Sequence, residues 1–235
     1  MNSMKNYDDL VAKLQKKVQV NPRDAETWME MVKLCEEAIC EGVDVARWMK
    51  ARRPMIQQAN LLGANLKLRI REIVLAGGCF WGAEHYLKLV KGVVATEVGY
   101  ANGNTENPTY QEVYTDATGF AEAVHVWYDS ERLKLERLLE LYFVAIDPTS
   151  VNQQGPDKGT RYRTGIYYMD KADVATIEAV MKQEDAKYEE LIEVEMLPLK
   201  NFYRAEDYHQ DYLDKNEDGY CHLPLDLFEW VKNQD

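Results

Sequence analysis

Hydrophobic residues in the first part of the chain recur every three or four positions, the period of an amphipathic helix. Three segments show this pattern, with apolar positions at Leu10, Leu14 and Val18, at Trp28, Val32, Cys35 and Ile39, and at Val45, Trp48 and Met49. Asn21 and Pro22 fit an N-cap and a first helical residue, and Pro54 is expected to end or kink the third helix. The pattern predicts an all-helical N-terminal extension over residues 1–66.

Beyond residue 66, the helical period gives way to short apolar runs separated by polar segments. The runs predict strands over 70–76, 93–100, 123–128, 164–169 and 191–197. Helical spacing predicts helices over 131–145, 170–189 and 204–213. Two long polar segments, 101–121 and 147–163, are typical of functional loops. We therefore expect an α+β domain over residues 67–235, with helices packed on a mixed sheet.

Composition narrows the classes of function. The 235 residues are 46% hydrophobic and 29% charged, which is ordinary for a globular chain with one full domain and a smaller accessory part. The formal charge of −12 argues against a nucleic-acid partner, since phosphate contacts require a basic patch. The N-terminal residues show neither the apolar core of a signal peptide nor a membrane span, so we expect a cytoplasmic protein with no membrane partner.

The chain has four cysteines, Cys35, Cys40, Cys79 and Cys221, and four scattered histidines. No C-x-x-C pair occurs, so we expect no metal site. Cys35 and Cys40 lie near one face of a predicted helix, where bridging geometry is poor, and are expected to fill the core. Cys79 and Cys221 are therefore the candidate reactive thiols.

Cys79 lies in the run from Gly77 to Glu84, where a predicted strand ends and a helix begins. Unpaired N–H groups at a helix start favour a thiolate over a thiol, so Cys79 is a candidate nucleophile. Phe80 and Trp81 add apolar surface beside the sulfur. The alternative is a buried structural cysteine, because free cysteine is often buried.

Five motifs in order along the chain carry a resemblance to a known family. They are Gly77-Gly78-Cys79-Phe80-Trp81-Gly82-Ala83-Glu84, Val98-Gly99-Tyr100, Asn107-Pro108-Thr109-Tyr110, Gly119-Phe120-Ala121-Glu122-Ala123-Val124, and Gly159-Thr160-Arg161-Tyr162-Arg163-Thr164. Over residues 70 to 222 the chain resembles the peptide methionine sulfoxide reductase A family. The resemblance implies reduction of methionine-S-sulfoxide, free or in proteins, by a catalytic domain over 67–235. The expected fold is a two-layer sandwich derived from the ferredoxin-like fold.

The resemblance also implies a role for each matched residue. Cys79 is the attacking thiolate, and Phe80 with Trp81 forms the apolar wall that receives the substrate methyl group. Glu122 protonates the sulfoxide oxygen. The hydroxyls of Tyr110 and Tyr162 hydrogen-bond that oxygen, and Asp157 orders polar groups around the site. No metal or organic cofactor is implied.

The reaction itself needs a nucleophile, an acid and an apolar pocket, and these residue types supply all three. A carboxyl acid must stay protonated near neutral pH, which the apolar neighbours of Glu122, Ala121 and Ala123, would favour through desolvation. Alternatives remain for single residues. Glu122 can be a surface carboxylate at a strand start, and Asp157 a turn residue beside Gly159.

Cys221 follows the predicted helix over 204–213 in a segment that resembles the family's recycling segment. The resemblance implies that a sulfenic acid on Cys79 condenses with Cys221 to a disulfide, which thioredoxin then reduces. No cysteine follows Cys221, so the cycle would use two cysteines. Two other hypotheses stay open: a thiol peroxidase or redox sensor that uses the same cysteine pair, and a binding module for oxidised methionine.

Overall fold

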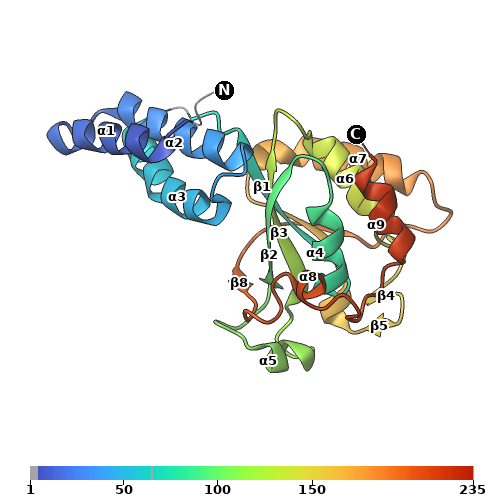
Figure 1. The fold of residues 1–235 in the computed structure, drawn as a ribbon. Helices are drawn as coiled ribbons and strands as arrows, with labels where there is room; N and C mark the ends of the chain where they lie inside the picture. The colour runs from blue at the N-terminus through green and yellow to red at the C-terminus, as the bar shows by residue number, and fades with distance from the viewer. Residues whose placement is uncertain (1–4, 65, 235) are drawn as a thin grey trace. The chain divides into compact units, whose positions relative to one another are not determined.

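The structure, a computed structural model, describes residues 5–64 and 66–234 of the chain. It divides into two compact units, Met1–Arg71 and Glu72–Asp235. Among the described residues, no helix has the length and apolar character needed to cross a membrane. Each unit has its own set of elements, coloured along the chain in Figure 1.

The first unit is built from three helices, α1 (Tyr7–Val20), α2 (Ala25–Cys40) and α3 (Val45–Leu61). The N-cap of α2 is Asp24, whose carboxylate accepts a hydrogen bond from the Thr27 N–H at 3.0 Å and one from the Thr27 hydroxyl at 2.7 Å. The predicted cap at Asn21 is therefore wrong, because Asn21 ends α1 instead. Pro54 lies inside α3, which continues to Leu61.

The second unit is organised around a six-stranded sheet in the order β7-β6-β1-β3-β2-β8. The strands are β1 (Ile70–Gly77), β2 (Val93–Ala101), β3 (Ala121–Asp129), β6 (Thr164–Tyr168), β7 (Glu195–Pro198) and β8 (Phe202–Arg204). The pairs β1 with β6, β2 with β3 and β2 with β8 are antiparallel, whereas β6 and β7 are parallel. The expected mixed sheet is confirmed.

Helices and short elements connect these strands. The longer helices are α4 (Phe80–Lys88), α6 (Leu135–Val144), α7 (Val174–Asp185) and α9 (Leu225–Lys232). The shorter elements are α5 (Tyr110–Tyr114), α8 (Tyr212–Lys215), the ribbon of β4 (Gln153–Gln154) and β5 (Asp157–Lys158), and the 3-10 turns η1 (Thr160–Tyr162) and η2 (Lys171–Asp173). In Figure 1, α4 lies against the sheet and α5 lies beyond one end of it.

Alternate residues along a strand face opposite sides of the sheet, so the hydrophobic core has one cluster on each face. Ile73 and Leu75 of β1 belong to a large cluster with the buried residues of α4, α6, α7 and α9. Val74 and Ala76 belong to a small cluster on the opposite face, capped by Phe202 and its neighbours. This is the two-layer arrangement expected, with helices packed on one face of the sheet.

Two predicted elements differ in the structure. The strand expected over 191–197 begins only at Glu195. The helix expected over 204–213 is absent, since β8 ends at Arg204 and α8 begins at Tyr212. The Gln210 side chain explains the second difference, because its amide pairs with the Val98 backbone N–H and C=O, both at 2.9 Å. These bonds, with the Ala205 N–H donated to the Val98 carbonyl at 3.0 Å, hold the segment against β2 in an irregular conformation.

Candidate functional site

Cys79 lies in the turn between β1 and α4. It is the N-cap residue of α4, and 5% of it is exposed. Gly78 before it has a φ of +80°, and a Cβ there would lie 2.6 Å from Cβ of Gln154. Both facts require glycine at this position. The backbone N–H of Trp81 points at the Cys79 sulfur. The sequence therefore folds into a sharp turn that places one thiol at the start of a helix.

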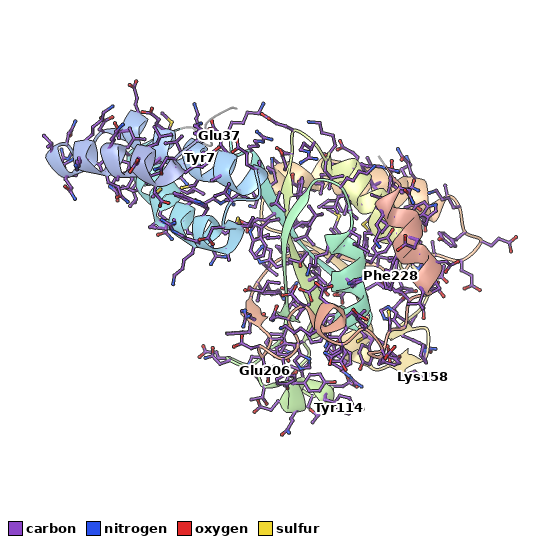
Figure 2. The ribbon with its side chains drawn as sticks, viewed as in Figure 1. Tyr7, Glu37, Tyr114, Lys158, Glu206 and Phe228 are labelled. Carbon is purple, nitrogen blue, oxygen red and sulfur yellow. The ribbon has the colours of Figure 1, made fainter. Side chains whose placement is uncertain are left out.

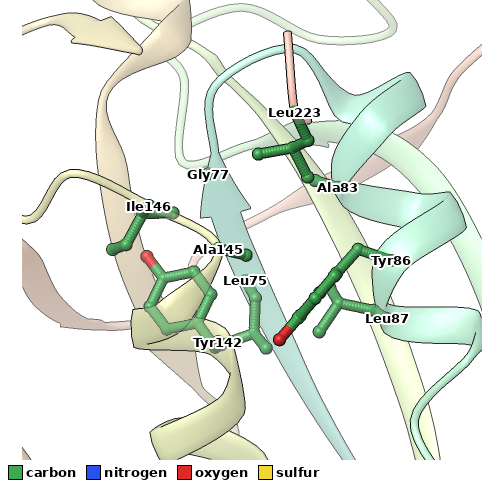
Figure 3. Close-up of a pocket in the computed structure, with 9 residues that line it drawn as sticks. All are labelled: Leu75, Gly77, Ala83, Tyr86, Leu87, Tyr142, Ala145, Ile146 and Leu223. Atoms are coloured by element: carbon green, nitrogen blue, oxygen red, sulfur yellow. The ribbon is translucent and has the colours of Figure 1, made fainter. Parts of the chain in front are cut away.

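An apolar pocket lies behind this turn (Figure 3). Its lining comes from β1, α4, the end of α6 and the C-terminal segment: Leu75, Gly77, Ala83, Tyr86, Leu87, Tyr142, Ala145, Ile146 and Leu223. The Tyr142 hydroxyl donates to the Ala76 carbonyl at 2.7 Å. Cys79 is not part of the lining, so this pocket is distinct from the polar groups that surround the thiol.

The surroundings of Cys79 oppose its ionisation. Burial is the largest cause that raises the pKa of its thiol, and Glu122 is the second where its carboxyl is ionised, while the Trp81 N–H acts in the opposite direction. The expectation that the helix start favours the thiolate is therefore wrong for this structure. Desolvation outweighs the helix start, because the sulfur is almost fully removed from solvent.

Glu122 lies on β3, is 1% exposed, and accepts a hydrogen bond from the Phe80 N–H at 3.1 Å. Burial raises the pKa of Glu122 to about 8, even though the Phe80 N–H and the distant charge of Arg161 lower it. The carboxyl is therefore mainly protonated near neutral pH. It lies beside Cys79, since the residue that donates to it is the next one along the chain.

Phe80 and Trp81 form an aromatic surface with residues from the C-terminal segment. The Trp81 ring stacks on Tyr212 at 3.8 Å between centroids, and its indole N–H donates to Nδ1 of His209 at 3.0 Å. Phe80 is buried, and its ring centroid lies 5.1 Å from that of His209. The two side chains therefore form part of one wall, held in orientation by the chain that follows β8.

His209 is a residue of the site that the sequence did not reveal. Burial lowers the pKa of its imidazole to about 4, so the ring is neutral and accepts the Trp81 hydrogen bond. Its centroid lies 4.5 Å from that of Tyr110. His209 thus joins the aromatic wall to the tyrosine of α5. The sequence indicated no role for His209, because its contacts come from Trp81 and Tyr110, which lie far away along the chain.

Tyr110 and Tyr162 reach the site from two separate loops. Tyr110 begins α5, and its N–H donates to Glu206 at 2.9 Å; Tyr162 ends the η1 turn and is 7% exposed. Burial raises the pKa of both hydroxyls, followed by the charge of Glu122, and Cys79 also contributes to both. The hydroxyls are thus close to both groups and stay protonated. Figure 2 labels Glu206 and Tyr114 at this end of the unit.

Asp157 and Cys221 also lie near Cys79, and both contribute, after burial and Glu122, to raising the pKa of its thiol. Asp157 accepts a hydrogen bond from the Tyr220 hydroxyl at 2.7 Å. A Cβ on Gly82 would lie 2.9 Å from the Cys221 sulfur, so the second thiol rests against the first turn of α4. Within the described residues, no cysteine is part of a disulfide.

The structure thus brings together every predicted site residue: Cys79, Phe80, Trp81, Tyr110, Glu122, Asp157, Tyr162 and Cys221. It adds Glu206 and His209, for which the sequence offered no signal beyond their place in the segment before Cys221. A buried thiol, a protonated carboxyl, two protonated tyrosines and an aromatic wall suit a polar, oxygen-bearing substrate with a small apolar group. The Cys221 thiol lies near the Cys79 thiol.

Comparisons with known proteins identify the same region. Residues 71–234 match the family described as peptide methionine sulfoxide reductase. A protein of that name from Clostridium acetobutylicum is 55% identical over 160 residues, which are 68% of this chain and 99% of the relative. Another from Lachnoclostridium phytofermentans is 53% identical over 163 residues, 69% of this chain and 98% of the relative.

Two solved structures resemble the fold. Mxr1 from Saccharomyces cerevisiae in reduced form is 38% identical with a TM-score of 0.64, covering 67% of this chain and 92% of that one. Methionine sulfoxide reductase A of Corynebacterium diphtheriae is 37% identical with a TM-score of 0.60, covering 66% and 79%. The family match begins at residue 71, so α1, α2 and α3 lie outside it.

Proposed function

The chain belongs to the peptide methionine sulfoxide reductase family, and from this premise we propose that it reduces methionine-S-sulfoxide, free or protein-bound, to methionine. The observation that carries the proposal is Glu122, a buried carboxyl with a pKa of about 8 beside the Cys79 thiol. A sulfoxide oxygen needs such an acid to leave its sulfur. We assign catalysis to residues 67–235 and regard residues 1–66 as a helical extension.

The first step joins Cys79 to the substrate. The Cys79 sulfur attacks the sulfoxide sulfur while Glu122 donates a proton to the oxygen, and Tyr110 and Tyr162 hydrogen-bond that oxygen as negative charge builds on it. The substrate methyl group rests against Phe80 and Trp81. A bond then forms between the oxygen and the Cys79 sulfur, while the substrate sulfur–oxygen bond and the bond between the two sulfurs break. Methionine leaves reduced, and Cys79 is left oxidised by two electrons as a sulfenic acid. The thiol proton restores Glu122, so this step consumes no external reductant.

The second step returns the enzyme to its dithiol form. The Cys221 thiol attacks the sulfenic acid, a disulfide forms between Cys79 and Cys221, and the oxygen leaves as water. The Cys221 position against Gly82 supports this pairing. We infer that thioredoxin, a dithiol reductant, then reduces the disulfide and supplies the two electrons of the cycle. A reducing compartment suits this chemistry, so we place the protein in the cytoplasm.

Epimer-resolved turnover tests the proposal. The purified chain is given separate S and R epimers of methionine sulfoxide with dithiothreitol, and methionine is measured over time. We expect turnover of the S epimer and at least about a hundredfold less of the R epimer, a difference of about 2.7 kcal/mol in transition-state binding. Reduction of hydrogen peroxide without reduction of either epimer would replace the proposal with a thiol peroxidase.

A further inference from the structure

Three potential metal ligands converge at the edge of the proposed active site. The Cys79 sulfur, a carboxylate oxygen of Asp157 and a ring nitrogen of His222 all lie within 4.8 Å of one another. They come from three separate loops, after β1, at β5 and before α9. The expectation of no metal site rested on spacing along the chain, which does not reveal ligands brought together from positions so far apart.

Asp157 and His222 each keep a ligand atom that makes no hydrogen bond of normal geometry with a described residue. Asp157 uses Oδ1 to accept from Tyr220 at 2.7 Å, while Oδ2 is buried and makes no hydrogen bond with any described residue. Both ring nitrogens of His222 are shielded from solvent; the ring lies close enough to the Gly77 backbone for that contact to raise its pKa, but neither nitrogen makes a hydrogen bond of normal geometry within the described part of the chain. Buried polar atoms in folded proteins are usually satisfied, so orphaned ones on two neighbouring side chains point to a ligand.

Three glycines form the seat in which the His222 ring rests. A Cβ on Gly78 would lie 3.2 Å from Nε2, a Cβ on Gly82 3.1 Å from Nδ1, and a Cβ on Gly155 3.9 Å from the Cβ of His222. The imidazole is therefore held between α4 and the β4–β5 ribbon, beside the nucleophile. Burial lowers the pKa of His222. A neutral imidazole is the form that binds metals.

We propose that Cys79, Asp157 and His222 form a binding site for a zinc ion in the reduced protein. Thiolate sulfur, imidazole nitrogen and carboxylate oxygen are all ligands of zinc, and three of them leave one tetrahedral position for water. Ligand atoms around tetrahedral zinc are roughly 3.5 Å apart, from the usual bond lengths. The cluster is within about 1.3 Å of that spacing, which side-chain rotation covers.

Zinc binding is an exchange of a proton for a metal ion. The S–H bond of Cys79 breaks, a sulfur–zinc bond forms, and the proton goes to solvent; no electron is transferred. The site therefore exists only while Cys79 is reduced, because a disulfide with Cys221 removes the thiolate. If the proposed function holds, zinc also competes with methionine sulfoxide for the same sulfur, so the ion inhibits the enzyme and is not its cofactor.

Direct binding tests the site without relying on activity. Full-length protein is reduced, freed of reductant, and equilibrated with zinc ions against a chromophoric chelator. We expect about one zinc per chain at micromolar concentration. Cys79→Ser should abolish binding, and His222→Ala and Asp157→Asn should each weaken it at least about tenfold, the effect typical of a lost ligand or its support. Cys40→Ser and His85→Gln are matched controls outside the cluster and should bind as the parent does.

Two further readouts separate the site from surface binding and from the catalytic proposal. Cobalt in place of zinc should show a thiolate-to-metal charge-transfer band that disappears in Cys79→Ser. Protein converted to the Cys79–Cys221 disulfide by a thiol-specific oxidant should bind no zinc there. Equal binding in His222→Ala, in Asp157→Asn or in the disulfide form would overturn the site, as would no stoichiometric binding at micromolar zinc. None of these outcomes depends on whether sulfoxide is reduced.

Discussion

Glu36 and Glu122 are buried glutamates from different units of the chain, and their surroundings differ. Glu36 in the helical unit pairs with Arg52 at 2.7 Å and accepts from the backbone N–H groups of Arg69 at 3.0 Å and Ile70 at 3.1 Å. Glu122 in the catalytic unit, Glu72–Asp235, accepts a hydrogen bond from the Phe80 N–H at 3.1 Å, and it forms no ion pair among the described residues. Burial raises the pKa of both, but only at Glu122 to about 8.

The buried thiols form a second pair for comparison. Cys35 is fully buried, contacts the Met55 sulfur at 3.7 Å, and burial raises its pKa to about 11. Cys79 is buried almost as deeply, but beside it lie the acid Glu122 and the second thiol Cys221. Burial alone therefore does not mark a reactive group. What distinguishes Cys79 from Cys35 is burial next to a protonated carboxyl and a second thiol.

The largest predicted effect separates the two thiols. Cys79→Ser should lower kcat/KM for methionine-S-sulfoxide by at least about 10³-fold, as expected when the nucleophile is removed. Cys35→Ala should leave kcat/KM within about twofold, because an isolated core thiol takes no part in the reaction. Steady-state assays with dithiothreitol measure both. Comparable loss in the two variants would remove the distinction.

The next effect separates the two carboxyls. Glu122→Gln should lower kcat/KM by about 10²-fold to 10³-fold, the usual contribution of a positioned general acid. Glu36→Gln should keep the rate but lower the free energy of unfolding by about 3–5 kcal/mol, because it leaves buried Arg52 without its partner. Kinetics and urea denaturation on both variants test the contrast; an unchanged rate in Glu122→Gln would assign the acid elsewhere.

A smaller effect concerns pH and stability. The pKa of Glu122 is raised from an ordinary 4.5 to about 8, so its stabilising contribution is fully present below about 4.5 and is lost as pH rises through about 8. The comparison uses two variants, Cys79→Ser and the double variant Cys79→Ser, Glu122→Gln. As pH rises between those values, the free energy of unfolding of the single variant should fall relative to that of the double variant, by at most about 1.4 kcal/mol per pH unit. If the stability curves of the two variants run parallel from about pH 5 to 9, the Glu122 carboxyl has an ordinary pKa in the folded protein.

The smallest effect concerns the tyrosines. Tyr110→Phe and Tyr162→Phe each remove one hydroxyl donor, and we expect about a tenfold loss in kcat with little change in KM, equivalent to about 1.4 kcal/mol. Tyr114→Phe is the control, because Tyr114 is 54% exposed. A loss in KM alone would make the hydroxyls contacts for substrate binding and not for the transition state.

The amount predictable from sequence differs between the units. In the helical unit, apolar spacing found all three helices and erred at the Asn21 cap, since the competing cap Asp24 lies only three residues on. In the catalytic unit, short apolar runs found the central strands. The segment around Gln210 was misread as helix, because side-chain bonds to Val98 decide its conformation and leave no periodic signal.

The site shows a similar limit. Motif context singled out Cys79 and Glu122 as candidates, and the apolar neighbours of Glu122 correctly suggested a raised pKa for its carboxyl. The sequence could not weigh desolvation of Cys79 against its helix start, because burial depends on the whole fold. His209 and His222 were not assigned roles for the same reason: long-range contacts, not spacing, bring them to the site.

A single turnover without reductant tests the central claim most directly. The fully reduced chain is mixed with excess methionine-S-sulfoxide, methionine is counted, and the thiols are mapped by mass spectrometry of peptides. We predict one methionine per chain and a new disulfide between Cys79 and Cys221, with Cys35 and Cys40 unchanged. Absence of methionine, or a disulfide that leaves Cys79 reduced, would contradict the account.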